Sequence, residues 1–472
     1  MDSAFWSYLK EAVGEEITEK VRDALSGPAS VSVRLNPNKI SEPAQDALAR
    51  IFSVAPDPVS WSPYGFYLPE RPQFTLDPAL HAGCYYVQDS SAMYVGHAFR
   101  RSLRSMLLSR SVSPENPLRV LDLCAAPGGK TTDLAASLRA ECGDSFVLVA
   151  NEIMKQRATV LADNVGIWGD PSVVVTSADP GAFAELSGYF DIIVADVPCS
   201  GEGMFRKDEE AVDQWSSDNV ALCQSRQRRI IADVWPALAQ NGILVYSTCT
   251  FNKCENDQNV EWIAKELGAE VIMPDDDLFP GLFRTQYGIR LLPGLVRGEG
   301  QYSAALTKTE STPQAKISGR AAKKRGPAGS VPAELRARVE TWFDHPVRLA
   351  AKGDMIVAMT PVVAAEMETL DYLHPLLRGT AVGQLKGKDI VPDADLALSI
   401  MLKRGAFPEV ELSKDKALAF LHKDAITLPE ADRGIVLLTY GGHPLGFVKN
   451  LGNRCNSLHP QNRRIRMDIN NA

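Results

Sequence analysis

The chain has 472 residues, of which 45% are hydrophobic, and a formal net charge of −8. At roughly 100–200 residues per domain, this length predicts two to four domains with full cores, and the acidic balance is not the one typical of nucleic-acid-binding proteins. No apolar run approaches the roughly 18 residues of a membrane span, and the N-terminus does not resemble a secretion signal. We therefore expect a soluble, cytoplasmic protein. The eight cysteines form no Cys-x-x-Cys pair, which argues against zinc knuckles and redox motifs, and we predict no metal site.

Residues 1–95 are predicted to form a small α+β domain. Residues 1–26 have the pattern of one or two helices, and residues 30–37 alternate like a strand that stops at Pro37. Residues 90–108 then predict a helix that leads into the next domain.

Residues 96–306 show a regular alternation of apolar strands and helical spacers, which predicts an open, mostly parallel sheet. The strands are predicted at residues 118–123, 146–152, 172–176, 190–196 and 242–249. Ligands of such sheets bind beyond the carboxyl ends of the strands, so the residues that follow each strand are the candidate site.

A glycine-rich turn after the first of these strands is the predicted cofactor loop. It consists of Cys124, Ala125, Ala126, Pro127, Gly128, Gly129 and Lys130. The turn joins a strand to a helix N-terminus and its small residues allow close approach by a ligand. A phosphate-binding loop would need glycine in place of Cys124, and the dinucleotide fingerprint also fails.

Acidic residues follow the next strands. Glu152 lies 23 residues after Gly129, where a carboxylate accepts hydrogen bonds from both ribose hydroxyls of a nucleoside cofactor. Asp179 is placed to reach an adenine amino group. A site with these carboxylates favours a cofactor without phosphates. The sequence therefore predicts S-adenosylmethionine, which carries a sulfonium cation.

Two cysteines follow neighbouring strands: Cys199 ends the run Asp196-Val197-Pro198-Cys199, and Cys249 lies in Thr248-Cys249-Thr250. Amino-methylating enzymes have an aromatic residue where this chain has Cys199. Two thiols at adjacent strand ends indicate nucleophilic catalysis. A nearby positive group is needed to raise the thiolate fraction.

The C-terminal third is more basic than the rest. Residues 311–472 hold 23 Lys and Arg against 17 Asp and Glu, a balance of +6, which leaves −14 on residues 1–310. Residues 307–330 are polar and basic and are predicted to be a linker, either solvated or touching phosphates. The remaining region, 331–472, is predicted to hold strands at residues 355–359, 435–440 and 444–448, with a hairpin turn between the last two.

Three motifs carry a resemblance to a known family. DLCAAPGGKT, ADVPCSGEGMFRKD and YSTCTFNKCEND are together similar to RNA 5-methylcytosine methyltransferases of the Fmu/Sun group, and the tail from Gly383 to Arg466 resembles the PUA-like end of the bacterial RsmF/YebU branch. The resemblance implies an α/β fold: a Rossmann-like S-adenosylmethionine-dependent methyltransferase core, a small α+β N-terminal RNA-binding domain and a C-terminal PUA-like, β-rich domain.

The resemblance also implies a reaction, methylation of C5 of cytosine in 16S ribosomal RNA through a covalent adduct. Cys249 would attack C6 of the base and Cys199 would assist loss of the C5 proton and release of the enzyme. Asp196 would hydrogen-bond the N3 and amino edge of the cytosine, and it also counts among the cofactor-binding residues. The base must be single-stranded or flipped out.

Two alternatives remain open: a transfer-RNA methyltransferase with the same chemistry, and a non-catalytic RNA-binding factor of ribosome assembly. The predicted partner is 16S rRNA within the 30S subunit, with no DNA or membrane partner, and the chain is predicted to be a monomer. Arg454, Arg463, Arg464 and Arg466 are predicted to contact the RNA backbone. Removal of residues 311–472 is predicted to leave cofactor binding intact.

Overall fold

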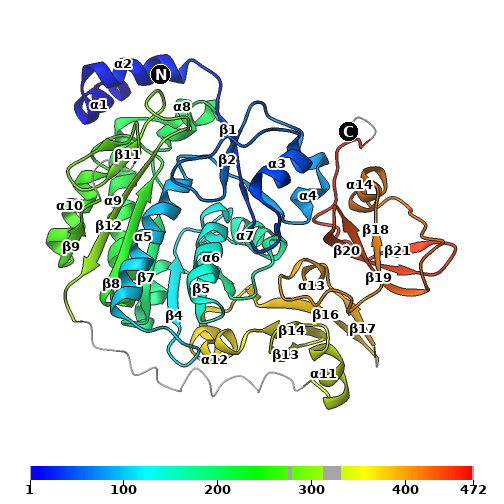
Figure 1. Ribbon diagram of the computed structural model, residues 1–472. Coiled ribbons are helices and arrows are strands. Elements are labelled where there is room, and N and C mark those ends of the chain that lie inside the picture. Colours follow the sequence, from blue (N-terminus) through cyan, green and yellow to red (C-terminus); the bar gives the residue numbers. More distant parts are fainter. Residues whose placement is uncertain (1, 275–278, 312–330, 388, 470–472) are drawn as a thin grey trace.

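The structure is a computed structural model that describes residues 2–274, 279–311, 331–387 and 389–469. A ten-stranded mixed sheet forms the centre of the molecule, and three smaller sheets accompany it (Figure 1). Among the described residues, no helix is long and apolar enough to cross a membrane.

The described part of the N-terminal region has four α-helices and a three-stranded antiparallel sheet in the order β2-β1-β3. Its elements are α1 (Ser3–Val13), α2 (Glu15–Leu25), β1 (Val31–Leu35), α3 (Ala44–Phe52), β2 (Gly65–Leu68), α4 (Pro78–His81) and β3 (Tyr85–Val87). Asp2 caps α1 by accepting a hydrogen bond from Ala4 N, and Gly14, at φ 82°, separates the two helices. The predicted helices at residues 1–26 are confirmed.

The central sheet has the strand order β10-β11-β12-β8-β7-β4-β5-β6-β15, with β9 paired to β12. Its strands other than β15 are β4 (Leu118–Asp122), β5 (Phe146–Asn151), β6 (Val173–Thr176), β7 (Phe190–Asp196), β8 (Leu238–Thr248), β9 (Ala269–Ile272), β10 (Phe283–Arg284), β11 (Ile289–Leu291) and β12 (Gln301–Lys308). The pairings from β8 through β7, β4 and β5 to β6 are parallel. The five strands predicted from the sequence are therefore confirmed as the parallel part of the sheet.

Helices cover both faces of the central sheet. They are α5 (Met93–Ser109), α6 (Gly129–Cys142), α7 (Lys155–Trp168), α9 (Ser217–Val234) and α10 (Asp257–Glu266). The short helix α8 (Glu209–Gln214) packs instead against a separate cluster that contains Phe5 of α1. Phe99 and Leu134 belong to the core on one face, and Ile231 and Ile263 to the core on the other. All six residues of β5 are buried, which explains why the strand is apolar throughout.

The C-terminal region contains two four-stranded sheets, β13-β14-β16-β17 and β18-β19-β20-β21. Its elements are α11 (Ala333–Glu340), β13 (Arg348–Lys352), β14 (Met355–Met359), α12 (Pro361–Leu370), β15 (Leu377–Arg378), β16 (Thr380–Lys386), β17 (Asp389–Pro392), α13 (Ala394–Leu398), β18 (Glu409–Glu411), α14 (Lys414–His422), β19 (Gly434–Tyr440), β20 (His443–Asn450) and β21 (Cys455–Ser457). The three strands predicted here are confirmed. Of the predicted linker, residues 307 and 308 belong to β12, and residues 312–330 lie outside the described residues.

The C-terminal region packs against both the central sheet and the N-terminal region. β15 pairs with β6 and so extends the central sheet, and Val363 and Met367 of α12 lie in the core on one of its faces. The sheet that contains β19 shares a second core with the N-terminal sheet, in which Phe420 and Ile465 join Val33. This packing argues against the prediction that removal of residues 311–472 leaves cofactor binding intact.

One of the four predicted RNA-contacting arginines has a structural role instead. The Arg463 guanidinium lies 2.7 Å from a carboxylate oxygen of Asp395 and 3.3 Å from one of Asp163 on α7. Only 11% of its side chain is exposed, so the prediction that it contacts RNA phosphates is wrong. Arg454 and Arg466 are exposed.

Candidate active site

The predicted cofactor loop runs from the end of β4 to the start of α6. Gly128, at φ 114°, makes the turn into the helix, a conformation that favours glycine. Behind the loop, Asn164 Nδ2 donates to the Pro127 carbonyl over 2.7 Å, and Arg157 Nη2 donates to the Ala126 carbonyl over 3.0 Å. Sequence reasoning missed both α7 side chains, because a helix-surface asparagine or arginine carries no motif.

Three of the acids lie where the strands end. Asp122 is fully buried and accepts a hydrogen bond from Thr131 Oγ1 over 2.6 Å, while its Oδ1 has no partner among the described residues. Burial raises the pKa of Asp122 to about 7. Glu152 is 3% exposed and lies 3.2 Å from the Arg157 guanidinium. Asp179 is exposed and caps the turn that follows β6.

These acids fit a cationic cofactor. Within the described chain, two basic side chains lie at the cofactor loop, and each already forms an ion pair with a carboxylate. Arg157 pairs with Glu152, and Lys130 pairs with Asp196. A phosphate-bearing cofactor would meet repulsion from the carboxylates, whereas a sulfonium ion would be attracted. Glu152 Oε1 accepts a hydrogen bond from Met154 N, and Glu152 Oε2 pairs with Arg157. Each of these oxygens has a second lone pair that can accept a hydrogen bond from a ribose hydroxyl.

Lys130 connects the cofactor loop to the predicted catalytic residues. Its ammonium lies 2.8 Å from Asp196 Oδ2, and Asp196 Oδ1 accepts hydrogen bonds from Ser247 Oγ (2.6 Å) and Gln301 Nε2 (2.9 Å). Burial alone would lower the pKa of Lys130, but Asp196 outweighs it and the pKa rises. Cys249 and Asp122 add to this rise, so Lys130 is a charged ammonium held between the cofactor loop and Asp196.

The structure brings the two predicted catalytic thiols together. Cys199 Sγ lies 3.3 Å from Cys249 Sγ, at the carboxyl ends of the neighbouring strands β7 and β8. The hydrogen bond with Cys249, together with burial, raises the pKa of Cys199 well above its ordinary value. Cys199 therefore keeps its proton at neutral pH, which favours Cys249 as the nucleophile.

Two buried carboxyl groups hold the thiol-bearing loops in place, and neither was predicted. Glu255 accepts hydrogen bonds from Ser200 N (3.0 Å), Asn252 Nδ2 (2.9 Å) and Gln227 Nε2 (2.7 Å), so it joins the loop after β7 to the loop after β8. Glu202 accepts from the same Asn252 amide over 2.9 Å. Burial, with Glu202 close by, raises the pKa of Glu255 to about 7. The Cys199–Cys249 separation is thus fixed by a hydrogen-bonded network rather than by the strands alone.

A close approach of the two loops also requires Gly203. Its N–H donates to the Cys249 carbonyl over 2.7 Å, and a Cβ at this position would lie 2.8 Å from that oxygen. Any larger residue would displace the backbone that carries Cys249.

A doubly covered parallel sheet, a glycine turn that opens a helix and acids at the following strand ends define a Rossmann-like methyltransferase. Known proteins agree. The family described as the N-terminal domain of 16S rRNA methyltransferase RsmF matches residues 1–90. The family described as 16S rRNA methyltransferase RsmB/F matches residues 110–307. The methyltransferase RsmF PUA domain matches residues 407–465.

Full-length relatives define the family more closely. The chain is 32% identical over 454 residues to ribosomal RNA small subunit methyltransferase F of Serratia proteamaculans, covering 93% of this chain and 91% of the relative. It is 30% identical to the Shewanella baltica (strain OS223) protein of the same name, with the same coverage. The chain belongs to the ribosomal RNA small subunit methyltransferase F family.

Solved structures resemble about two thirds of the chain. A methyltransferase homologue from Pyrococcus horikoshii superposes with a TM-score of 0.53 at 25% identity and covers 65% of this chain and 95% of its own. The NSun6 protein from the same organism, solved with SFG, has a TM-score of 0.52 at 18% identity, covers 66% of this chain and 99% of its own, and shares the fold.

Proposed function

We propose that this protein methylates C5 of cytosine in 16S ribosomal RNA, with S-adenosylmethionine as the methyl donor. The observation that carries the proposal is the pair of thiols 3.3 Å apart at the ends of β7 and β8. Asp196 and Lys130 join this pair to the cofactor loop. Methylation of an amino group does not require two thiols at these strand ends.

The cofactor-binding residues follow from the loop and the strand ends. Residues 124–130 would cradle S-adenosylmethionine, with Glu152 on the ribose hydroxyls and Asp179 near the adenine amino group. Asp196 borders this site from the side of the thiols, since Lys130 holds it against the loop. When bound, the cofactor supplies an electrophilic methyl group.

In the forward reaction the Cys249 thiolate forms a bond to C6 of the flipped-out cytosine. The electron pair of the C5–C6 double bond moves into the ring and makes C5 nucleophilic enough to accept a methyl group. At the N3 and amino edge of the base, Asp196 accepts a hydrogen bond from the amino group, and from N3–H when that nitrogen is protonated as C6 is attacked, which orients the base and stabilises charge. The bonds that Asp196 accepts from Ser247 and Gln301 hold the carboxylate in that position.

Release of the product uses Cys199. As the bond between Cys249 and C6 breaks, Cys199 donates its proton to the departing sulfur, and the resulting Cys199 thiolate accepts the C5 proton. The C5–C6 double bond re-forms and both cysteines are ready for another cycle after Cys249 loses its proton. The raised pKa of Cys199 suits it to carry this proton.

The substrate is tested by methylation assays on 30S particles, free 16S RNA and transfer RNA, with the modified cytosine located by bisulfite sequencing. We expect activity on 16S RNA, with the assembled subunit preferred, from a monomeric enzyme in the cytoplasm. Exclusive activity on transfer RNA would assign the protein to the alternative substrate. A lack of adduct and of methylation on every RNA, with RNA binding retained, would instead leave the non-catalytic assembly factor.

Cofactor recognition gives a quantitative expectation. Glu152→Ala should weaken S-adenosylmethionine binding by roughly 1–3 kcal/mol, the value of a hydrogen bond to a charged group. Isothermal calorimetry measures this directly. Glu141→Ala on α6 is the matched control, because it removes the same charge from a carboxylate paired with Arg104 instead of facing the loop. Equal affinities for the two variants would contradict the ribose role of Glu152.

A further inference from the structure

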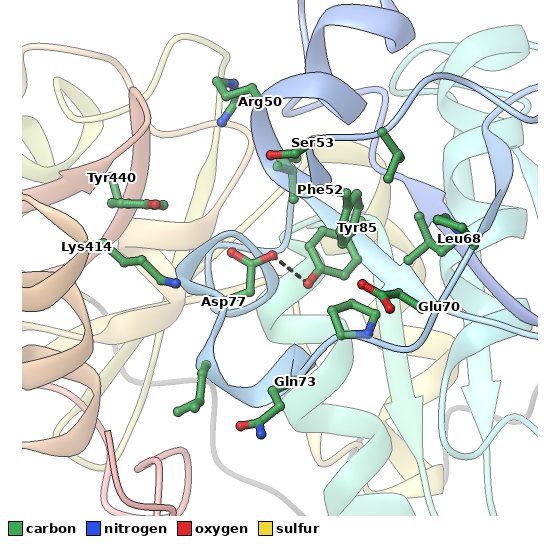
Figure 2. A pocket seen from close by; sticks show the side chains of 15 residues that line it. Arg50, Phe52, Ser53, Leu68, Glu70, Gln73, Asp77, Tyr85, Lys414 and Tyr440 are labelled. Carbon is green, nitrogen blue, oxygen red and sulfur yellow. Dashed lines mark hydrogen bonds between the residues drawn. The ribbon is translucent and has the colours of Figure 1, made fainter. Parts of the chain in front are cut away.

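A cavity of about 570 Å³ lies between the N-terminal region and the C-terminal sheet that contains β19 (Figure 2). On one side it is lined by the end of α3, by residues 68–77 and by Tyr85 of β3. On the other side it is lined by Lys414 of α14 and Tyr440 of β19. The volume lies within the range of small-molecule binding sites, roughly 300–1,000 Å³. It exists only because the two regions pack together.

Several polar side chains line this cavity without a protein partner. Lys414, Tyr440 and Gln73 make no side-chain hydrogen bond or ion pair with any described residue. Figure 2 shows the Lys414 ammonium pointing toward Asp77 without forming an ion pair with it. An ammonium, a phenol and an amide gathered around one cavity offer both hydrogen-bond donors and acceptors to a ligand.

The cavity also presents aromatic surface. The rings of Phe52 and Tyr85 pack edge to face at 4.9 Å, and the Tyr85 hydroxyl donates to Asp77 over 2.7 Å, which fixes this wall. Tyr440 lies across the cavity from them and is partly exposed (Figure 2). Aromatic rings beside an ammonium and an amide group are a combination that recognises a splayed-out nucleotide of single-stranded RNA. Two carboxyl groups, Glu70 and Asp77, also line the cavity, and burial raises the pKa of Asp77.

A single strand connects this cavity to the cofactor site. Tyr85 and Tyr86 are neighbours in β3 and therefore point to opposite faces. Tyr85 lines the cavity, whereas the Tyr86 hydroxyl donates to the Pro127 carbonyl of the cofactor loop over 3.2 Å. A ligand in the cavity is thus attached to the same rigid element as the cofactor loop.

We propose that this cavity binds one nucleotide of the substrate RNA, other than the target cytosine, with its base against Tyr440 and its phosphate against Lys414. The inference rests on the proposed function, since it assumes an RNA substrate. Its physical basis is the set of unpartnered donors and aromatic rings, and it gives the junction of the two regions a role in holding RNA.

The test compares two charge reversals on one helix. Lys414 lines the cavity, whereas Lys416, two residues along α14, does not, and both lysines are exposed. Binding of a 16S rRNA transcript, measured by filter binding at fixed salt, should weaken roughly tenfold more for Lys414→Glu than for Lys416→Glu. A 4-thiouridine-substituted transcript should crosslink the wild-type protein within residues 50–54, 68–77 or at Tyr440, a readout that needs no substitution.

Equal RNA affinities for the two lysine variants, or crosslinks that all lie elsewhere, would overturn the proposal. Wild-type methylation of 16S RNA is measured in parallel. If that activity is present while the cavity variants bind normally, the cavity proposal fails and the proposed function stands.

Discussion

Cys249→Ser is expected to abolish both methylation and the covalent protein–RNA adduct, whereas Cys199→Ala is expected to accumulate the adduct. The first variant lacks the thiolate that attacks C6. The second can still attack, but the neighbouring proton donor 3.3 Å away is missing, so the C–S bond does not break efficiently. Denaturing gel electrophoresis of protein incubated with 16S RNA and S-adenosylmethionine separates the adduct from free protein.

The control for this pair is Cys142→Ala, at the end of α6. This thiol lies at the end of a helix and does not follow β7 or β8. Its removal should leave the turnover rate and the adduct level as in the wild type. An adduct in the Cys249 variant, with none in the Cys199 variant, would reverse the two roles. Both variants are expected to bind the RNA, so a loss of adduct reports on chemistry.

A chain that ends at residue 310 is expected not to fold at 25 °C. It would expose the sheet face that Val363, Met367 and Leu370 of α12 cover, and the N-terminal sheet would lose Phe420 and Ile465 from its core. At roughly 1.5–3 kcal/mol for each large apolar side chain, five such losses amount to about 7.5–15 kcal/mol, which is comparable with the usual total stability of roughly 5–15 kcal/mol. Circular dichroism and thermal unfolding of the fragment measure this.

The matched comparison uses the full chain with exposed arginines replaced. Arg454→Ala and Arg466→Ala should leave the melting temperature within a few degrees of the wild type, since both side chains are exposed. Recovery of a soluble 1–310 fragment with wild-type affinity for S-adenosylmethionine would show that the C-terminal region is dispensable to the catalytic fold.

The parallel sheet and the candidate site residues could be predicted because both depend on short, continuous stretches of sequence. Each strand is a short apolar run, and each candidate residue follows a strand directly, so the fold alone brings them to one edge. The same reasoning predicts that Cys199 and Cys249 lie close together, and their sulfur atoms are 3.3 Å apart in the structure. This reasoning also places Glu152 beside the cofactor loop.

Contacts between distant segments were not predictable in the same way. Nothing around Glu366 indicates that its carboxylate pairs with Arg119 of β4 over 2.7 Å, or that its helix covers the central sheet. Helix α10 begins at Asp257 and does not include Asn252. The Asn252 side chain is instead committed to Glu202 and Glu255, and such buried polar bonds outweigh local helix preference.

The core shared by the N-terminal sheet and the last sheet has a consequence for synthesis on the ribosome. Val33 and Leu35 are translated early, but their partners Leu438 and Ile465 emerge about 400 residues later. At about 5–20 residues per second, this leaves an apolar surface of the nascent chain uncovered for roughly 20–80 s. The region translated first is therefore completed last, and chaperones that shield exposed apolar surface should engage it during that interval.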